Sequence, residues 1–147
     1  MDSGYIMILN GPNINLTGIR RRDVYGAESY DDMMAYIAGH VACGLKAEQH
    51  NGEGEIIDAL HRCHFDDECR GVVLNAGAYT HYSYAIADAI EAIAKPVVEV
   101  HLSNIAAREE FRAKSVIAPM CVGSIAGFGK MSYILAVNAL LAHASED

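Results

Sequence analysis

The chain has 147 residues, and 52% of them are hydrophobic. This length and composition suit a single domain over 1–147 with a sizeable core, and they give no sign of a second domain. The 11 lysines and arginines are outnumbered by 19 aspartates and glutamates, and the net charge of -8 argues against partners such as nucleic acid or an anionic membrane surface. A few arginines focused in one cleft can still attract a small anionic substrate, because charges act over a Debye length of about 8 to 10 Å.

The N-terminus has no basic leader, and the apolar run Tyr5–Leu9 is too short for a signal peptide or a membrane span. We therefore expect a cytoplasmic protein. The four cysteines lie in helix-like and strand-like segments of a chain large enough to be stable without disulfides, so we expect reduced thiols.

Strand-like and helix-like segments alternate along the chain. Nearly continuous apolar runs predict buried strands, and hydrophobic side chains that recur every three or four residues predict helices. In chain order we predict a strand at 5–10, a helix from the N-cap Ser29 to Leu45, a strand at 45–50, a helix at 55–64, a strand at 71–75, a helix at 80–94, strands at 96–102 and 116–122, and a helix at 128–143. This alternation predicts an α/β fold, a flavodoxin-like doubly wound five-stranded parallel sheet with helices on both faces.

Polar residues follow three of the predicted strands. They form the segments 10–15 (NGPNIN), 75–81 (NAGAYTH) and 99–104 (EVHLSN). Ligands in such folds bind outside the carboxyl ends of the strands, so we expect one hydrogen-bond-rich crevice that suits a polyhydroxylated or carboxylated molecule. The glycines match neither the dinucleotide nor the phosphate-loop pattern. Each turn sequence taken singly is also compatible with an ordinary structural turn.

Glu99 and His101 alternate on the strand predicted at 96–102, so both side chains point to one face, where a buried strand usually carries valine or isoleucine. The pattern favours a glutamate that fixes the tautomer of His101 and keeps its ring protonated, as a general acid requires. A structural histidine is the alternative.

The segment 61–69 (HRCHFDDEC) contains two histidines and two cysteines but matches no standard zinc spacing. It precedes a strand, on the side of the sheet opposite the predicted crevice. We therefore expect no metal site.

Four ordered blocks extend over nearly the whole chain. They are LNGPNINLTGIRRRDVYG at 9–26, NAGAYTHYSYAIADAI at 75–90, VEVHLSNIAAREEFR at 98–112 and SIAGFGKMSYILAV at 124–137. Together they resemble type II 3-dehydroquinate dehydratases. The resemblance implies an enzyme without cofactor or metal that reversibly dehydrates 3-dehydroquinate to 3-dehydroshikimate, by anti elimination through an enolate and without a Schiff base. Both aromatic amino-acid biosynthesis through the shikimate pathway and quinate catabolism use this reaction, and the sequence leaves the two open.

The resemblance also implies roles in the reaction. Tyr25 stands at the position of the base, and Arg20 at that of the arginine whose guanidinium favours the phenolate over a phenol with a pKa of about 10. Asn13 corresponds to the asparagine that holds a water against the enolate. His101, paired with Glu99, would protonate the departing hydroxyl.

The remaining matched positions imply substrate binding. Asn75 and the backbone amides of Leu102 and Ser103 would hold the carboxylate, while His81 and Arg112 would engage ring hydroxyls. These positions come from two different blocks, so the resemblance implies that the two blocks meet at one site.

Asp88 matches an aspartate that reaches a neighbouring subunit's site, so the resemblance implies a homo-oligomer of trimers that assemble to a dodecamer. Arg108 either supports the site or is an ordinary surface arginine.

Several positions depart from the family pattern, namely Arg21, Arg22, Ala106 and Ser132. The first two lie in the segment Gly18–Gly26, which in the family is a lid over bound substrate, and they replace a frequent Glu-Pro. The alternative to an enzyme is a non-catalytic carboxylate-binding module on the same fold.

Overall fold

One parallel sheet of five strands, in the order β2-β1-β3-β4-β5, organises the chain. The computed structural model describes residues 4–19, 22–25 and 27–145, with the backbone only at 24, 25 and 145. The strands are β1 (Tyr5–Asn10), β2 (Gly44–Gln49), β3 (Cys69–Asn75), β4 (Val97–His101) and β5 (Gly123–Ala126). This order confirms the predicted flavodoxin-like doubly wound sheet.

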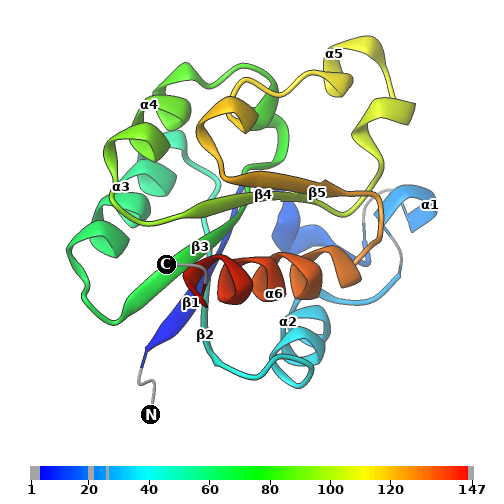
Figure 1. Cartoon of the computed structure of the whole chain (residues 1–147). Helices are drawn as coiled ribbons and strands as arrows, with labels where there is room; N and C mark the ends of the chain where they lie inside the picture. The colour runs from blue at the N-terminus through cyan, green and yellow to red at the C-terminus, as the bar shows by residue number, and fades with distance from the viewer. Residues whose placement is uncertain (1–3, 20–21, 26, 146–147) are drawn as a thin grey trace.

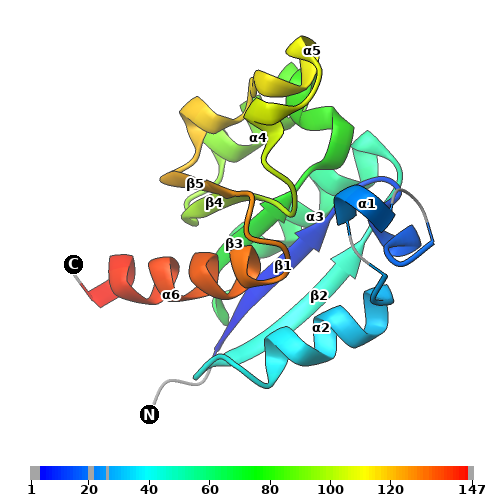
Figure 2. The ribbon, with the colours of Figure 1, turned by 90° about the vertical axis from the view of Figure 1, so that its right-hand side faces the viewer.

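Helices cover both faces of the sheet (Figures 1 and 2). The helices are α1 (Arg22–Tyr25), α2 (Tyr30–Ala38), α3 (Glu53–Phe65), α4 (Tyr84–Ala92), α5 (Glu110–Ala113) and α6 (Met131–Ser145). Short 3₁₀ turns connect them at η1 (Ile14–Leu16), η2 (Gly77–His81), η3 (Ile105–Ala107) and η4 (Ala118–Met120). The pair α2 and α6 packs on one face and the pair α3 and α4 on the other.

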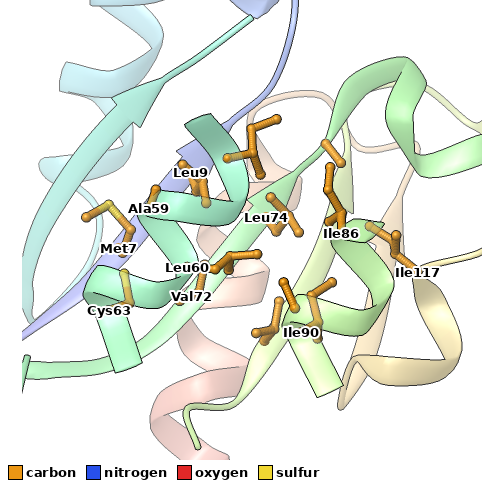
Figure 3. Packing of buried hydrophobic residues seen from close by; sticks show 14 of the residues in the cluster. Met7, Leu9, Ala59, Leu60, Cys63, Val72, Leu74, Ile86, Ile90 and Ile117 are labelled. Carbon is orange, nitrogen blue, oxygen red and sulfur yellow. The ribbon is translucent and has the colours of Figure 1, made fainter. Parts of the chain in front are cut away.

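The pleat of the central strands divides the core into two layers. Met7 and Leu9 of β1 face α3 and α4, where they pack with Leu60 and Ile86 (Figure 3). Ile6 and Ile8 face the opposite way and pack in the layer that α2 and α6 close. Burial on both faces explains why β1 and β3 are continuous apolar runs in the sequence.

The predicted fifth strand, Val116–Val122, is wrong, because the strand at this edge is β5, which begins at Gly123. Residues 118–120 instead form η4, which contains Pro119, and the Ser115 hydroxyl accepts a hydrogen bond from the Ala118 amide. Proline has no amide hydrogen to donate to a strand ladder, which explains why the chain pairs with β4 only after this residue.

Two predicted helices are too long. The first ends at Ala38, because Leu45 belongs to β2 and pairs with Ile6 of β1. The third is divided into η2 and α4, and Ser83 between them caps α4 by accepting a hydrogen bond from the Ile86 amide. In both segments the hydrophobic side chains keep a helical spacing past the point where the helix ends or is divided, so the spacing does not reveal these boundaries.

The carboxyl ends of β1 and β3 come together at Gly11, which is buried beside the backbone of Ala76. A Cβ atom at Gly11 would lie 2.6 Å from the Ala76 carbonyl oxygen, closer than a methyl group can approach. The Gly11 amide also donates a hydrogen bond to the Asn75 carbonyl over 2.7 Å. This close contact holds together the two loops that follow these strands.

Replacing Gly11 by alanine should therefore force the two loops apart and lower the free energy of unfolding by about 1 to 3 kcal/mol. Gly54 provides the matched control, because it is exposed in α3 and a Cβ atom there has no neighbour within 4 Å. Gly54→Ala should raise the stability by up to about 1 kcal/mol, since alanine favours the helix. Urea unfolding of both variants measures the difference, and equal shifts of the same sign would contradict this account of Gly11.

Candidate active site

A pocket lies at the carboxyl ends of β1, β3 and β4, where the sequence predicts a crevice. Its walls come from the loops after these strands and from the segment that contains η3 and α5. The predicted site residues that line it are Asn13, Asn75, His81, His101, Leu102, Ser103 and Arg112. Arg108 lines it as well. The structure thus brings residues from three separated sequence blocks to one cavity.

Glu99 lies directly behind His101, with its Oε2 atom 2.7 Å from His101 Nε2. The glutamate is 1% exposed. Three hydroxyl groups complete its shell: Thr80 and Ser115 donate to Oε2 over 2.6 and 2.7 Å, and Ser124 donates to Oε1 over 2.9 Å. A buried carboxylate is costly unless it is hydrogen-bonded, and these donors meet that requirement.

The partners of Glu99 keep it ionised. Burial by itself would raise the pKa of this carboxyl, but the hydrogen bond and charge of His101, with the hydroxyls of Thr80 and Ser115, lower the pKa to about 2. Because Nε2 of His101 is bound to Glu99, Nδ1 is the ring nitrogen left to act on a ligand in the pocket. The pair therefore has the geometry of a histidine oriented by a carboxylate.

Asn75 is almost fully buried at the end of β3, and its side chain is held at both ends. Its Nδ2 donates to the hydroxyl of Tyr133 over 2.9 Å, and its Oδ1 accepts from the Gly77 amide over 3.2 Å. An amide fixed in this way presents its remaining N–H in one direction.

Asn13 follows β1 in the left-handed backbone region, with a φ of 69°, which asparagine tolerates better than most residues. Its backbone amide donates a hydrogen bond to the Asn51 side-chain oxygen over 3.2 Å. Gln49 supports the same loop, because its Nε2 donates to both Asn51 Oδ1 and the Gly11 carbonyl. The end of β2 thus fixes the loop that carries Asn13.

His81 and Arg112 form the outer wall of the pocket. The Nδ1 atom of His81 lies 2.7 Å from the Lys114 carbonyl and donates to it, which leaves Nε2 as the acceptor of the neutral ring. Arg112 Nε lies 2.7 Å from a Glu109 carboxylate oxygen, but its N–H is not aligned with that oxygen, so the contact is an ion pair without a hydrogen bond. Its guanidinium lies over the Phe111 ring.

Among the predicted residues that the structure describes, Glu99 and Asp88 do not line this pocket. Asp88 is exposed on α4. Arg20 lies outside the described residues. Tyr25 ends α1, and its side chain also lies outside the described part.

The prediction of the site missed the hydroxyl shell and Tyr133. Thr80, Ser115 and Ser124 are separated from Glu99 by 19, 16 and 25 residues. The sequence contains only an indirect signal of these donors: a carboxylate on a buried strand needs hydrogen-bond donors, and hydroxyl-bearing residues stand beside neighbouring strand ends.

Ser132, which departs from the family pattern, accepts a hydrogen bond from the Phe128 amide. It thereby stabilises the loop after β5, where the amides of Gly127 and Gly129 bond to carbonyls of residues 101 and 102.

Over residues 4–19, 22–25 and 27–145, no three His, Cys, Asp or Glu side chains gather closely enough to hold a metal ion. Within the same described segments, no helix is both long and apolar enough to cross a membrane.

The lowered pKa of Glu99 predicts a specific dependence of stability on pH. A carboxyl with a lower pKa in the folded state stabilises the fold above its ordinary value of 4.5, and this contribution is lost as the pH falls toward about 2. The difference in unfolding free energy between the wild type and Glu99→Gln should therefore shrink when urea unfolding is repeated from about pH 6 down to about pH 3. Glu91→Gln, at an exposed position of α4, is the control. A difference that stays constant over this range would contradict the ionised state of Glu99.

The chain was also compared with known proteins. The family described as Dehydroquinase class II matches residues 4–141. A 3-dehydroquinate dehydratase of Caldicellulosiruptor bescii is 54% identical over 138 residues, which cover 92% of this chain and 94% of the relative. The crystal structure of a type II dehydroquinase from Butyrivibrio crossotus superposes with a TM-score of 0.91 at 41% identity, over 96% of this chain and 99% of that one. The crystal structure of a type II dehydroquinase from Propionibacterium acnes superposes with a TM-score of 0.89 at 38% identity, over 95% of this chain and 97% of that one. With this match over almost its entire length, the chain belongs to the class II dehydroquinase family.

Proposed function

We propose that this protein dehydrates 3-dehydroquinate to 3-dehydroshikimate, reversibly and by anti elimination through an enolate. The observation that carries the proposal is the buried Glu99–His101 pair at the wall of a pocket whose other polar groups suit a hydroxylated carboxylate. Membership of the class II dehydroquinase family supports the same substrate, since a relative 54% identical is named 3-dehydroquinate dehydratase.

In the first step, the Tyr25 phenolate takes a proton from the carbon next to the substrate carbonyl. Arg20 favours this phenolate by Coulomb attraction. The electron pair of the broken C–H bond moves onto the carbonyl oxygen and forms an enolate. A water molecule held by Asn13 donates a hydrogen bond to that oxygen, and the αL loop of Asn13 at the pocket wall fits this role.

In the second step, the enolate re-forms the carbonyl and expels the hydroxyl group from the carbon next to the one that lost its proton. His101 donates its proton to this group, which leaves as water. Glu99 stabilises the imidazolium before the transfer, because the carboxylate stays ionised beside the ring. Proton exchange with solvent then returns Tyr25 and His101 to their starting states.

The substrate carboxylate binds Asn75 and the backbone amides of Leu102 and Ser103. These groups are neutral donors, and their residues line the pocket. His81 and Arg112 bind the ring hydroxyls at the outer wall. The bond from His81 Nδ1 to Lys114 makes its Nε2 an acceptor for a substrate hydroxyl, while the Arg112 guanidinium is a donor.

Asp88 acts in a different site from the one its own chain forms. Its exposure on α4 is compatible with a contact to a neighbouring subunit, and we propose the trimers, grouped into a dodecamer, that the sequence resemblance implies.

The activity itself is tested by incubating the purified oligomer with 3-dehydroquinate at neutral pH and recording the absorbance of the conjugated enone product. Folded, oligomeric protein that forms no product would disprove the proposal.

The role of Tyr25 as base predicts the effect of Tyr25→Phe. Turnover should fall about 100-fold or more, while KM changes little, because the substrate contacts remain and only proton transfer is lost. Tyr84→Phe, at an exposed position of α4, removes a hydroxyl outside the pocket and should be neutral. A non-catalytic carboxylate-binding module would show no turnover in the wild type and no response in ligand affinity to the lost Tyr25 hydroxyl.

The role of Arg20 predicts a pH-dependent defect. In Arg20→Ala, turnover should be most depressed near pH 7 and should recover partly toward about pH 9 to 10, where the phenol ionises without help. Arg22→Ala is the matched control, because Arg22 is exposed and its Nε donates to the Gly18 carbonyl. A uniform loss of turnover across this range would be incompatible with the proposed role of Arg20, as would an equal recovery in Arg22→Ala.

A further inference from the structure

A continuous chain of hydrogen bonds, which is buried from Asn75 to Asn10 and partly buried at Tyr30, connects the pocket wall to α6 and α2. Tyr133, on α6, is fully buried, and its hydroxyl lies between two asparagines at the ends of neighbouring strands. It donates to Asn10 Oδ1 over 2.6 Å and accepts from Asn75 Nδ2 over 2.9 Å. Beyond Asn10, the chain ends at Tyr30, whose hydroxyl accepts from Asn10 Nδ2 over 3.1 Å.

The direction of this chain is fixed at the Asn75 end. A hydroxyl has one proton, so Tyr133 can donate to only one of the two amides. Asn75 Oδ1 already accepts from the Gly77 amide, which as a backbone N–H can only donate. If Asn75 were reversed, its NH₂ group would face that N–H, donor against donor. The proton of Tyr133 therefore goes to Asn10, and the lone pair of Tyr133 receives Asn75 Nδ2.

Burial preserves this arrangement. It raises the pKa of Tyr133 above the ordinary value of 10.0, so the hydroxyl keeps its proton at neutral pH. One N–H of Asn75 is thus bound to Tyr133 and its oxygen to Gly77, which leaves the second N–H for a ligand in the pocket.

We propose that Tyr133 is a positioning residue for substrate binding, which holds the Asn75 amide with its free N–H toward the substrate carboxylate. The proposal rests on the carboxylate-binding role proposed for Asn75. Tyr133 itself does not line the pocket and acts on the substrate only through Asn75.

The test compares the kinetics of Tyr133→Phe with those of Tyr30→Phe. Both variants lose one hydroxyl of the same series of hydrogen bonds, but only Tyr133 contacts Asn75. Tyr133→Phe should raise KM about five- to tenfold with kcat nearly unchanged, because a restraint on binding is lost while the acid and base remain. Tyr30→Phe should leave KM within about twofold of the wild type. KM does not depend on how much of a preparation is folded, so a loss of stability in either variant leaves the comparison of KM valid, and kcat is calculated for the folded fraction.

A double-mutant cycle identifies the route of the effect. Asn75→Ala should raise KM, and adding Tyr133→Phe to it should raise KM no further. If Asn75→Ala raises KM but Tyr133→Phe does not, the inference is wrong while the role of Asn75 stands. Equal increases in the Tyr30 and Tyr133 variants, or additive effects in the double variant, also overturn the inference. If Asn75→Ala leaves KM unchanged, the proposed carboxylate site fails, and the inference fails with it.

Discussion

The buried carboxylate of Glu99 is the constraint on which the rest of the site depends. A 1% exposed glutamate on a central strand is destabilising unless every side of it meets a donor. Its donors come from η2, from β4 itself, from Ser115 in the segment ahead of η4 and from β5. The hydrogen bonds to this one carboxylate thus fix the relative positions of segments that are far apart in the sequence. The cost of burying the carboxylate is offset by the same contacts that orient His101 toward the pocket.

A second buried network organises the other side of the pocket. The chain from Tyr30 through Asn10 and Tyr133 to Asn75 uses neutral groups only, and it lies at the ends of β1 and β3. The two networks divide the work of the site between them. In the proposed reaction, the ionised network orients the proton donor His101, and in the neutral network the bond between Asn75 and Tyr133 fixes the N–H of Asn75 that faces the substrate carboxylate.

The sequence was informative wherever one strong local pattern decided the structure. The apolar runs identified β1 and β3, and the alternation of Glu99 and His101 indicated the paired side chains that the structure shows 2.7 Å apart. The errors arose where tertiary contacts decided instead. Leu45 continues a helical spacing but pairs with Ile6 in the sheet, and the fifth strand had to follow Pro119. The donors to Glu99 could not be predicted, because serine and threonine are common in loops and only the folded chain selects which of them meet the carboxylate.

The central claim is that one pocket combines the Glu99–His101 acid with a carboxylate site at Asn75. A crystal structure of the oligomer with a bound, carboxylate-bearing analogue of 3-dehydroquinate tests it most directly. The account predicts the analogue's carboxylate on Asn75 and the amides of Leu102 and Ser103, and its departing hydroxyl within hydrogen-bond distance of His101 Nδ1, with Nε2 still on Glu99. An analogue bound in the reverse orientation, or a His101 ring turned away from Glu99 in the complex, would contradict it.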